Sequence, residues 1–117
     1  MKSNQLPLTE TVFYLLLAFS QPIYGYLAIK KIEELSQGEV RVAAGTMYGA
    51  IENLLKLNML EQLSSKNERR KVYQTTDYGN QILKAEVLRM THCIQLFESN
   101  GSAKNSMETA MNNEVMC

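Results

Sequence analysis

In the middle of this chain, one helical segment is followed at once by two short strand segments. Residues 44–57 repeat apolar side chains at the spacing of one helix face, and Asn58 is expected to end this helix because asparagine tolerates the left-handed conformation. Residues 60–65 and 71–75 alternate apolar and polar side chains on either side of a polar turn at residues 66–68. The order predicts a helix that leads directly into a β-hairpin.

Two more helices are predicted before this unit. Thr9 suits the N-cap of a helix over residues 10–20, which is apolar nearly all round and therefore expected to be buried on several sides. The second helix begins near residue 24, repeats apolar residues every three positions and ends at Gly38, the expected C′ residue. Residues 39–42 alternate polar and apolar side chains, which predicts a short strand.

A long helix is predicted after the hairpin, over residues 77–100, with Thr76 as its N-cap. Its apolar residues follow the a/d spacing of a coiled coil, and no other segment is free to cover them. A partner subunit is therefore expected, and residues 101–117 are expected to form a flexible tail. The predicted dimer-interface residues are Leu83, Val87, Met90, Ile94 and Phe97.

This order of elements predicts a mainly α fold with a small β-hairpin. Residues 8–76 correspond to a winged helix-turn-helix domain, and residues 77–100 to a C-terminal dimerisation helix. In such a domain the third helix enters the major groove of double-stranded DNA and the hairpin loop lies along the neighbouring backbone. A homodimer suits this role because its two-fold symmetry matches palindromic half-sites.

Charge is concentrated at the predicted hairpin turn. The twelve basic and twelve acidic residues of the chain cancel, yet residues 66–71 hold four basic residues and one acid. Cations at a hairpin tip suit phosphate binding, while on the third helix Asn53 is suited to pair with adenine and Gly49 to allow close approach. The predicted DNA-binding residues are Thr46, Tyr48, Gly49, Asn53, Lys56, Lys66, Arg69, Arg70 and Lys71. Tyr26 and Tyr73 are assigned to the core instead.

The composition argues against several other classes of protein. With one histidine and no phosphate-binding glycine loop, the chain is not expected to be an enzyme, and no catalytic residue or cofactor is predicted. The two cysteines match no metal motif; Cys93 is expected to be buried and His92 exposed. The longest apolar run is too short to span a membrane and no signal peptide is recognisable, so we expect a cytoplasmic protein.

Several motifs resemble those of PadR-family transcriptional regulators. They are Gly-Thr-Met-Tyr at residues 45–48, Arg-Arg-Lys-Val-Tyr at 69–73 and Thr-Asp-Tyr-Gly at 76–79, and the resemblance covers roughly residues 8–98. Two positions differ from the usual family residues: Asn58 stands where glycine is common, and Thr75 where leucine is common.

The resemblance implies a dimeric winged-helix repressor of the small subfamily, with a single C-terminal helix. Some members of that family are released from DNA by small molecules or stress, so an apolar effector binding at Met90 and Ile94 is one expectation. Plain coiled-coil packing of those residues is the other. A winged-helix protein-interaction module that has lost DNA binding is the alternative function, which the zero net charge keeps open.

Overall fold

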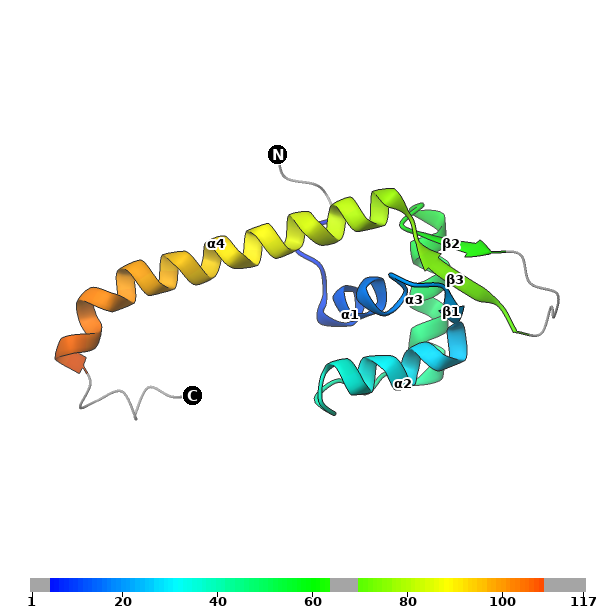
Figure 1. Ribbon diagram of the computed structural model, residues 1–117, viewed down its shortest axis with the longest axis horizontal. Coiled ribbons are helices and arrows are strands. Elements are labelled where there is room, and N and C mark those ends of the chain that lie inside the picture. Colours follow the sequence, from blue (N-terminus) through cyan, green and yellow to red (C-terminus); the bar gives the residue numbers. More distant parts are fainter. Residues whose placement is uncertain (1–4, 64–69, 109–117) are drawn as a thin grey trace. The chain divides into compact units, whose positions relative to one another are not determined.

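The computed structural model describes the backbone of residues 5–63 and 70–108, and the side chains of residues 5–63 and 70–101. The chain divides into two compact units, residues 1–86 and 87–117, and the last helix belongs to both. The elements of the described residues, in chain order (Figure 1), are α1 (Glu10–Ala18), β1 (Ile23–Tyr24), α2 (Gly25–Leu35), α3 (Ala44–Lys56), β2 (Leu60–Leu63), β3 (Val72–Thr75) and α4 (Asp77–Glu108). The architecture is a mainly α winged helix with a long C-terminal helix, as predicted.

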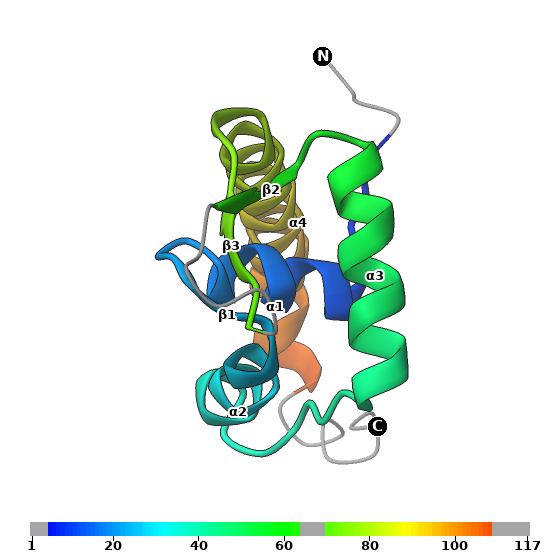
Figure 2. The same ribbon diagram turned by 90° about the vertical axis from the view of Figure 1, so that its right-hand side faces the viewer.

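The core of the first unit is built around α1. Leu15, Leu16 and Phe19 are fully buried, as expected for a helix that is apolar nearly all round. The ring of Phe19 meets the ring of Tyr73 edge to face, with centroids 5.8 Å apart, and so ties the end of α1 to β3. Helix α3 lies beside the small sheet (Figure 2). The core is completed by Ala18, Ala28, Ile32, Val40, Val42, Met47, Ile51, Leu54, Met59, Leu60, Ile82 and Leu83.

Two predicted helix boundaries are confirmed by their capping bonds. The hydroxyl oxygen of Thr9 accepts the backbone N–H of Val12 at 3.2 Å, which makes Thr9 the N-cap of α1. After α3, Asn58 adopts a left-handed conformation with φ of 61°. The N–H of Met59 then donates to the carbonyl oxygen of Leu54 at 2.9 Å, a bond typical of a Schellman ending.

The end of α2 is shifted by one residue from the prediction. Gln37, with φ of 55°, occupies the C′ position that Gly38 was expected to take, and Gly38 follows with φ of 83°. The N–H of Gly38 donates to the carbonyl oxygen of Glu33 at 2.8 Å, and that of Gln37 to Glu34 at 3.1 Å. The same bonding pattern ends α3 with Asn58 alone in the left-handed conformation, so the pattern requires this conformation only of Gln37. The positive φ of Gly38 is a further turn that glycine adopts without strain.

The described strands form an antiparallel sheet in the order β1-β3-β2. Leu60 pairs with Thr75 and Leu63 with Val72, which confirms the predicted hairpin; the turn at residues 66–68 lies outside the described residues. The strand predicted at residues 39–42 is wrong, because the free edge of β3 is occupied by β1 instead. The alternation at 39–42 comes from two valines that are buried without strand pairing.

The start of α4 is fixed to the turn after α3. Thr76 caps the helix as predicted: its hydroxyl oxygen accepts the N–H of Gly79 at 2.9 Å and donates to the carbonyl oxygen of Asn58 at 2.6 Å. The helix runs to Glu108, beyond the end predicted near residue 100. One asparagine and one glycine lower helix propensity without terminating a helix. No helix in the described ranges is long and apolar enough to cross a lipid bilayer.

Candidate nucleic-acid interface

One face of α3 is exposed, and two glycines leave part of its backbone uncovered. The apolar face of the helix is buried through Met47, Ile51 and Leu54. On the other side a Cβ atom placed on Gly45 or Gly49 would meet no other atom within 4 Å. The exposed backbone of this face can therefore come close to a flat or grooved surface such as a DNA duplex.

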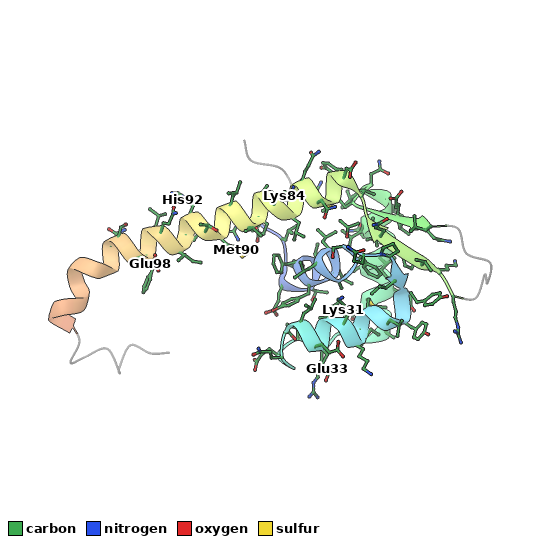
Figure 3. The ribbon with its side chains drawn as sticks, viewed as in Figure 1. Lys31, Glu33, Lys84, Met90, His92 and Glu98 are labelled. Atoms are coloured by element: carbon green, nitrogen blue, oxygen red, sulfur yellow. The ribbon has the colours of Figure 1, made fainter. Side chains whose placement is uncertain are left out.

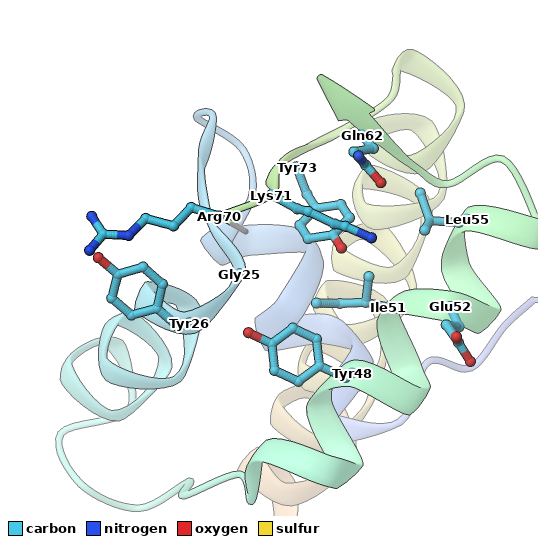
Figure 4. A pocket seen from close by; sticks show the side chains of 10 residues that line it. All are labelled: Gly25, Tyr26, Tyr48, Ile51, Glu52, Leu55, Gln62, Arg70, Lys71 and Tyr73. Atoms are coloured by element: carbon cyan, nitrogen blue, oxygen red, sulfur yellow. The ribbon is translucent and has the colours of Figure 1, made fainter. Parts of the chain in front are cut away.

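Beside this face lies a groove of about 400 Å³ between α3, the start of α2 and the strands β2 and β3 (Figure 4). Its floor is apolar, whereas its rim carries two exposed tyrosines, two cations and one carboxylate. Such a rim can bind an anion or a polar backbone through hydrogen bonds and charge. The lining residues are Gly25, Tyr26, Tyr48, Ile51, Glu52, Leu55, Gln62, Arg70, Lys71 and Tyr73.

Gly25 allows the elements around this groove to come together. A Cβ atom at this position would lie 3.2 Å from ring carbons of both Tyr48 and Tyr73, closer than nearly all real Cβ contacts. The backbone N–H of Gly25 also donates to the carbonyl oxygen of Lys71 at 3.1 Å. The first residue of α2 therefore anchors the start of β3 and leaves room for two aromatic rings.

Tyr73 lies at the inner wall of the groove and is 6% exposed. Burial raises the pKa of its hydroxyl above the ordinary value of 10.0, and the nearby Tyr48 and Glu52 raise that pKa further. The hydroxyl therefore remains protonated at neutral pH and can act as a hydrogen-bond donor. This agrees with the prediction that Tyr73 belongs to the core.

The segment of sequence that forms this helix face and the strands beside it matches a known protein family. Residues 14–85, more than half of the chain, match the model of the transcriptional regulator PadR-like family. The chain belongs to the PadR-like family. It is therefore a DNA-binding transcriptional regulator, and its family is not a family of enzymes. No curated protein sequence shows significant similarity to it.

Solved structures of transcriptional regulators share the fold of this PadR-like chain. A PadR family transcriptional regulator from Eggerthella lenta is 27% identical, with a TM-score of 0.59 over 80% of this chain and 79% of that one. A PadR family regulator from Clostridium difficile is 23% identical, with a TM-score of 0.62 over 75% and 95% of the two chains. RosR of H. salinarum, 19% identical, shares the fold over 96% and 97%, with a TM-score of 0.61.

The structure brings part of the predicted DNA-binding set of this PadR-like protein together. Thr46, Tyr48, Gly49, Asn53 and Lys56 are all exposed on α3. The hairpin of β2 and β3 with the turn that joins them is the wing of the winged helix. Just before β3, Arg70 and Lys71 are exposed and line the same groove as Tyr48. Lys66 and Arg69 lie outside the described residues. Contact of these residues with DNA stays a prediction.

The assignment of Tyr26 to the core is wrong. Its side chain is 48% exposed and lines the groove, because α2 buries Gly25, Ala28 and Ile32 instead. A three-residue repeat advances by about 60° per step around a helix of 3.6 residues per turn. The repeat that begins at Tyr26 therefore reaches the opposite side by Leu35. The sequence did contain an indication that Tyr26 lies at the groove, because two tyrosines flank the small residue Gly25.

The residues predicted for the dimer interface differ in exposure along α4. Leu83 is 9% exposed and belongs to the core of the first unit. Val87, Ile94 and Phe97 are exposed, the last at 76%, whereas Met90 is partly buried. Met90 and His92 project from different sides of the helix (Figure 3).

The predictions for His92 and Cys93, which lie among the interface positions of α4, have different outcomes. His92 is exposed, as predicted. Cys93 is also exposed, so the prediction of a buried thiol is wrong. Within α4, the guanidinium group of Arg89 donates to the sulfur of Cys93 at 3.8 Å, one turn away on the same helix.

Proposed function

We propose that this PadR-like regulator is a repressor that binds a palindromic operator as a homodimer in the cytoplasm. The observation that supports the proposal is the open face of α3 beside the groove that Arg70 and Lys71 line. Helix α3 carries one cation, Lys56, and one carboxylate, Glu52. Most of the phosphate attraction must therefore come from the wing.

The proposed division of roles follows the chemistry of each side chain. Asn53 presents a donor and an acceptor side by side, which suits paired hydrogen bonds to adenine in the major groove. Gly49 allows the helix backbone to approach the bases. Thr46 and Tyr48 donate hydrogen bonds to phosphate oxygens, and Lys56, Lys66, Arg69, Arg70 and Lys71 supply positive charge.

Dimerisation is proposed through an apolar stripe of α4 that is exposed except at the partly buried Met90. Val87, Met90, Ile94 and Phe97 follow the a/d spacing, and a second copy of the same helix presents a matching stripe. Exposed residues of this size are stabilised by burial against such a partner. Because the chain has zero net charge, two wings bound together attract DNA much better than one.

We also propose that the dimer interface can accept a flat apolar effector at Met90 and Ile94. Methionine suits this role because its flexible, polarisable side chain adapts to ligands of different shape. Binding of an effector there would change the spacing of the two DNA-binding domains and so release the operator. Titration of the dimer with apolar aromatic compounds, followed by operator release, tests this part separately.

The central experiment is selection of bound sequences from a pool of random duplexes. We expect a palindrome whose half-sites are about 10 base pairs apart, one helical turn of DNA. Enrichment of a single half-site would contradict the homodimer. Failure to enrich any sequence would instead support the protein-interaction module without DNA binding.

A variant pair tests the role of the wing in the same assay. Changing Arg69 and Arg70 together to alanine should weaken binding to all duplexes and lower the salt dependence. The matched control is Lys84→Ala, which removes one exposed cation from α4. Equal losses per cation removed in the two variants would show that general charge, and not the wing, governs binding.

A further inference from the structure

Two tyrosines and Arg70 form a stack at the base of the wing, and neither tyrosine is among the residues assigned above to DNA binding by sequence. The rings of Tyr24 and Tyr26 are stacked, with centroids 5.8 Å apart and an angle of 23° between their planes. The guanidinium carbon of Arg70 lies 5.8 Å from the centre of the Tyr26 ring. Figure 4 shows the Arg70 side chain extended toward Tyr26 at one end of the groove.

The backbone beneath this stack is held by the sheet. Tyr24 pairs with Val72, and the N–H of Gly25 donates to the carbonyl oxygen of Lys71. These bonds fix the residue that follows Arg70, while the face of Tyr26 attracts its guanidinium group. Arg70 is thus restrained at both its backbone and its charged end, although it is exposed to solvent.

The groove beside the stack suits one anionic group. Arg70 and Lys71 supply two positive charges against the single carboxylate of Glu52, and the hydroxyl of Tyr48 adds a hydrogen-bond donor. In a winged helix with α3 in the major groove and the hairpin on the adjacent backbone, a DNA strand passes between them. A phosphodiester of that strand is therefore the occupant that this chemistry and this position favour.

We propose that Tyr26 is a positioning residue that holds Arg70 at this groove, where Arg70 binds a phosphate of the DNA backbone. The inference rests on the proposed DNA-binding function, and it assigns a role to an aromatic residue of α2. The ring orients Arg70 before DNA binds, so Arg70 loses less side-chain entropy on binding. The affinity for DNA is therefore higher.

The test uses the full chain and a short fluorescent duplex of mixed sequence, because phosphate contacts do not depend on sequence. Binding is measured by anisotropy at a series of salt concentrations. Tyr26→Ala should weaken binding by about two- to fivefold, the range expected for an exposed cation–π pair. Its salt slope should move toward that of Arg70→Ala, which loses about 0.9 for each phosphate contact.

Three further variants separate positioning from folding or direct contact. Tyr26→Phe keeps the ring and should bind as the wild type does. Tyr26→Leu keeps apolar bulk without an aromatic face and should behave like Tyr26→Ala, even if the alanine variant folds poorly. Leu27→Ala removes a neighbouring side chain that is exposed and outside the groove lining, and it should have no effect.

The double variant gives the decisive comparison. If Tyr26 acts through Arg70, adding Tyr26→Ala to Arg70→Ala should cause no further loss of affinity. A full additional loss, or a wild-type salt slope in Tyr26→Leu, would overturn the positioning role. Absence of duplex binding by the wild-type protein would contradict the proposed function itself, which is a different result.

Discussion

The hydroxyl group of Thr75 donates a hydrogen bond to the backbone carbonyl oxygen of Leu16 at 2.8 Å. Leu16 lies in the last turn of α1, where carbonyl groups lack partners within the helix. The backbone N–H of Thr75 also donates to the carbonyl oxygen of Phe19 at 2.8 Å. The last residue of β3 therefore caps α1, which explains how a polar residue stands in the core where PadR-like proteins commonly have leucine.

Thr75→Val should lower the free energy of unfolding by about 1–3 kcal/mol, since a buried carbonyl loses its donor. Denaturant unfolding followed by circular dichroism measures the change. Thr75→Ser keeps the hydroxyl group and should recover most of the stability. A large loss in Thr75→Ser with little loss in Thr75→Val, which keeps the methyl group, would indicate that the methyl group, and not the hydrogen bond, is what matters.

Gly49→Ala should stabilise the fold and weaken DNA binding. Alanine in a helix interior is favoured over glycine by about 0.5–1 kcal/mol, and the added methyl group meets no atom of the protein. The same methyl group would hold the helix away from the bases; a roughly tenfold weaker affinity corresponds to about 1.4 kcal/mol.

Thermal unfolding and duplex titration of Gly49→Ala measure the two effects independently. Gly79→Ala provides the contrast for stability, because its Cβ would overlap the carbonyl oxygen of Met59 and lie 2.8 Å from a methyl carbon of Thr75. It should destabilise the fold by about 1–3 kcal/mol. Unchanged DNA affinity in Gly49→Ala would place this face of α3 away from the duplex.

Asn53→Ala should relax the preference at one base pair of the operator, with a loss of about 1–3 kcal/mol of discrimination at that position. Binding to a panel of single-base operator variants measures it. Lys56→Ala is the matched change on the same helix face and should weaken binding to all operator variants by the same factor. An equal loss of affinity for all operator variants in Asn53→Ala would indicate that this residue contacts the DNA backbone and not a base.

Tyr73→Phe should reduce the loss of stability at alkaline pH. The pKa of the Tyr73 hydroxyl is raised in the folded state, chiefly by burial, so the neutral form favours folding. This contribution is fully present below the ordinary value of 10.0 and is lost as the pH rises through the raised value. The stability of the wild type should therefore fall more steeply than that of Tyr73→Phe as the pH rises above 10.0; parallel stability curves would contradict this assignment.

Charged residues in the stripe of α4 should separate the proposed dimer. Ile94→Glu combined with Phe97→Glu places two carboxylates at seam positions, and sedimentation should then detect monomers. Leu88→Glu is the control, because Leu88 is 70% exposed but lies outside the a/d spacing. Monomers in the control and dimers in the double variant would move the interface to another face of the helix.

Local patterns in the sequence were sufficient for much of the fold. The periodicity of α1 and α3, the capping residues Thr9 and Thr76, and the left-handed Asn58 were all predicted correctly. These features depend on hydrogen bonds and side-chain spacing within a few residues. The exposed residues of α3 were also predictable, since they are those left over from its apolar face.

Other features depended on contacts between segments distant in the sequence. Two residues, Ile23 and Tyr24, form a strand because β3 has a free edge there, while the more strand-like residues 39–42 have no partner. Tyr26 was assigned to the core by its spacing, but the approach of β3 placed it beside Arg70. The sequence by itself determined the helices, the hairpin and the concentration of charge near the wing. Only tertiary packing decided which edge completes the sheet and which aromatic ring meets the arginine, because both depend on long-range pairing.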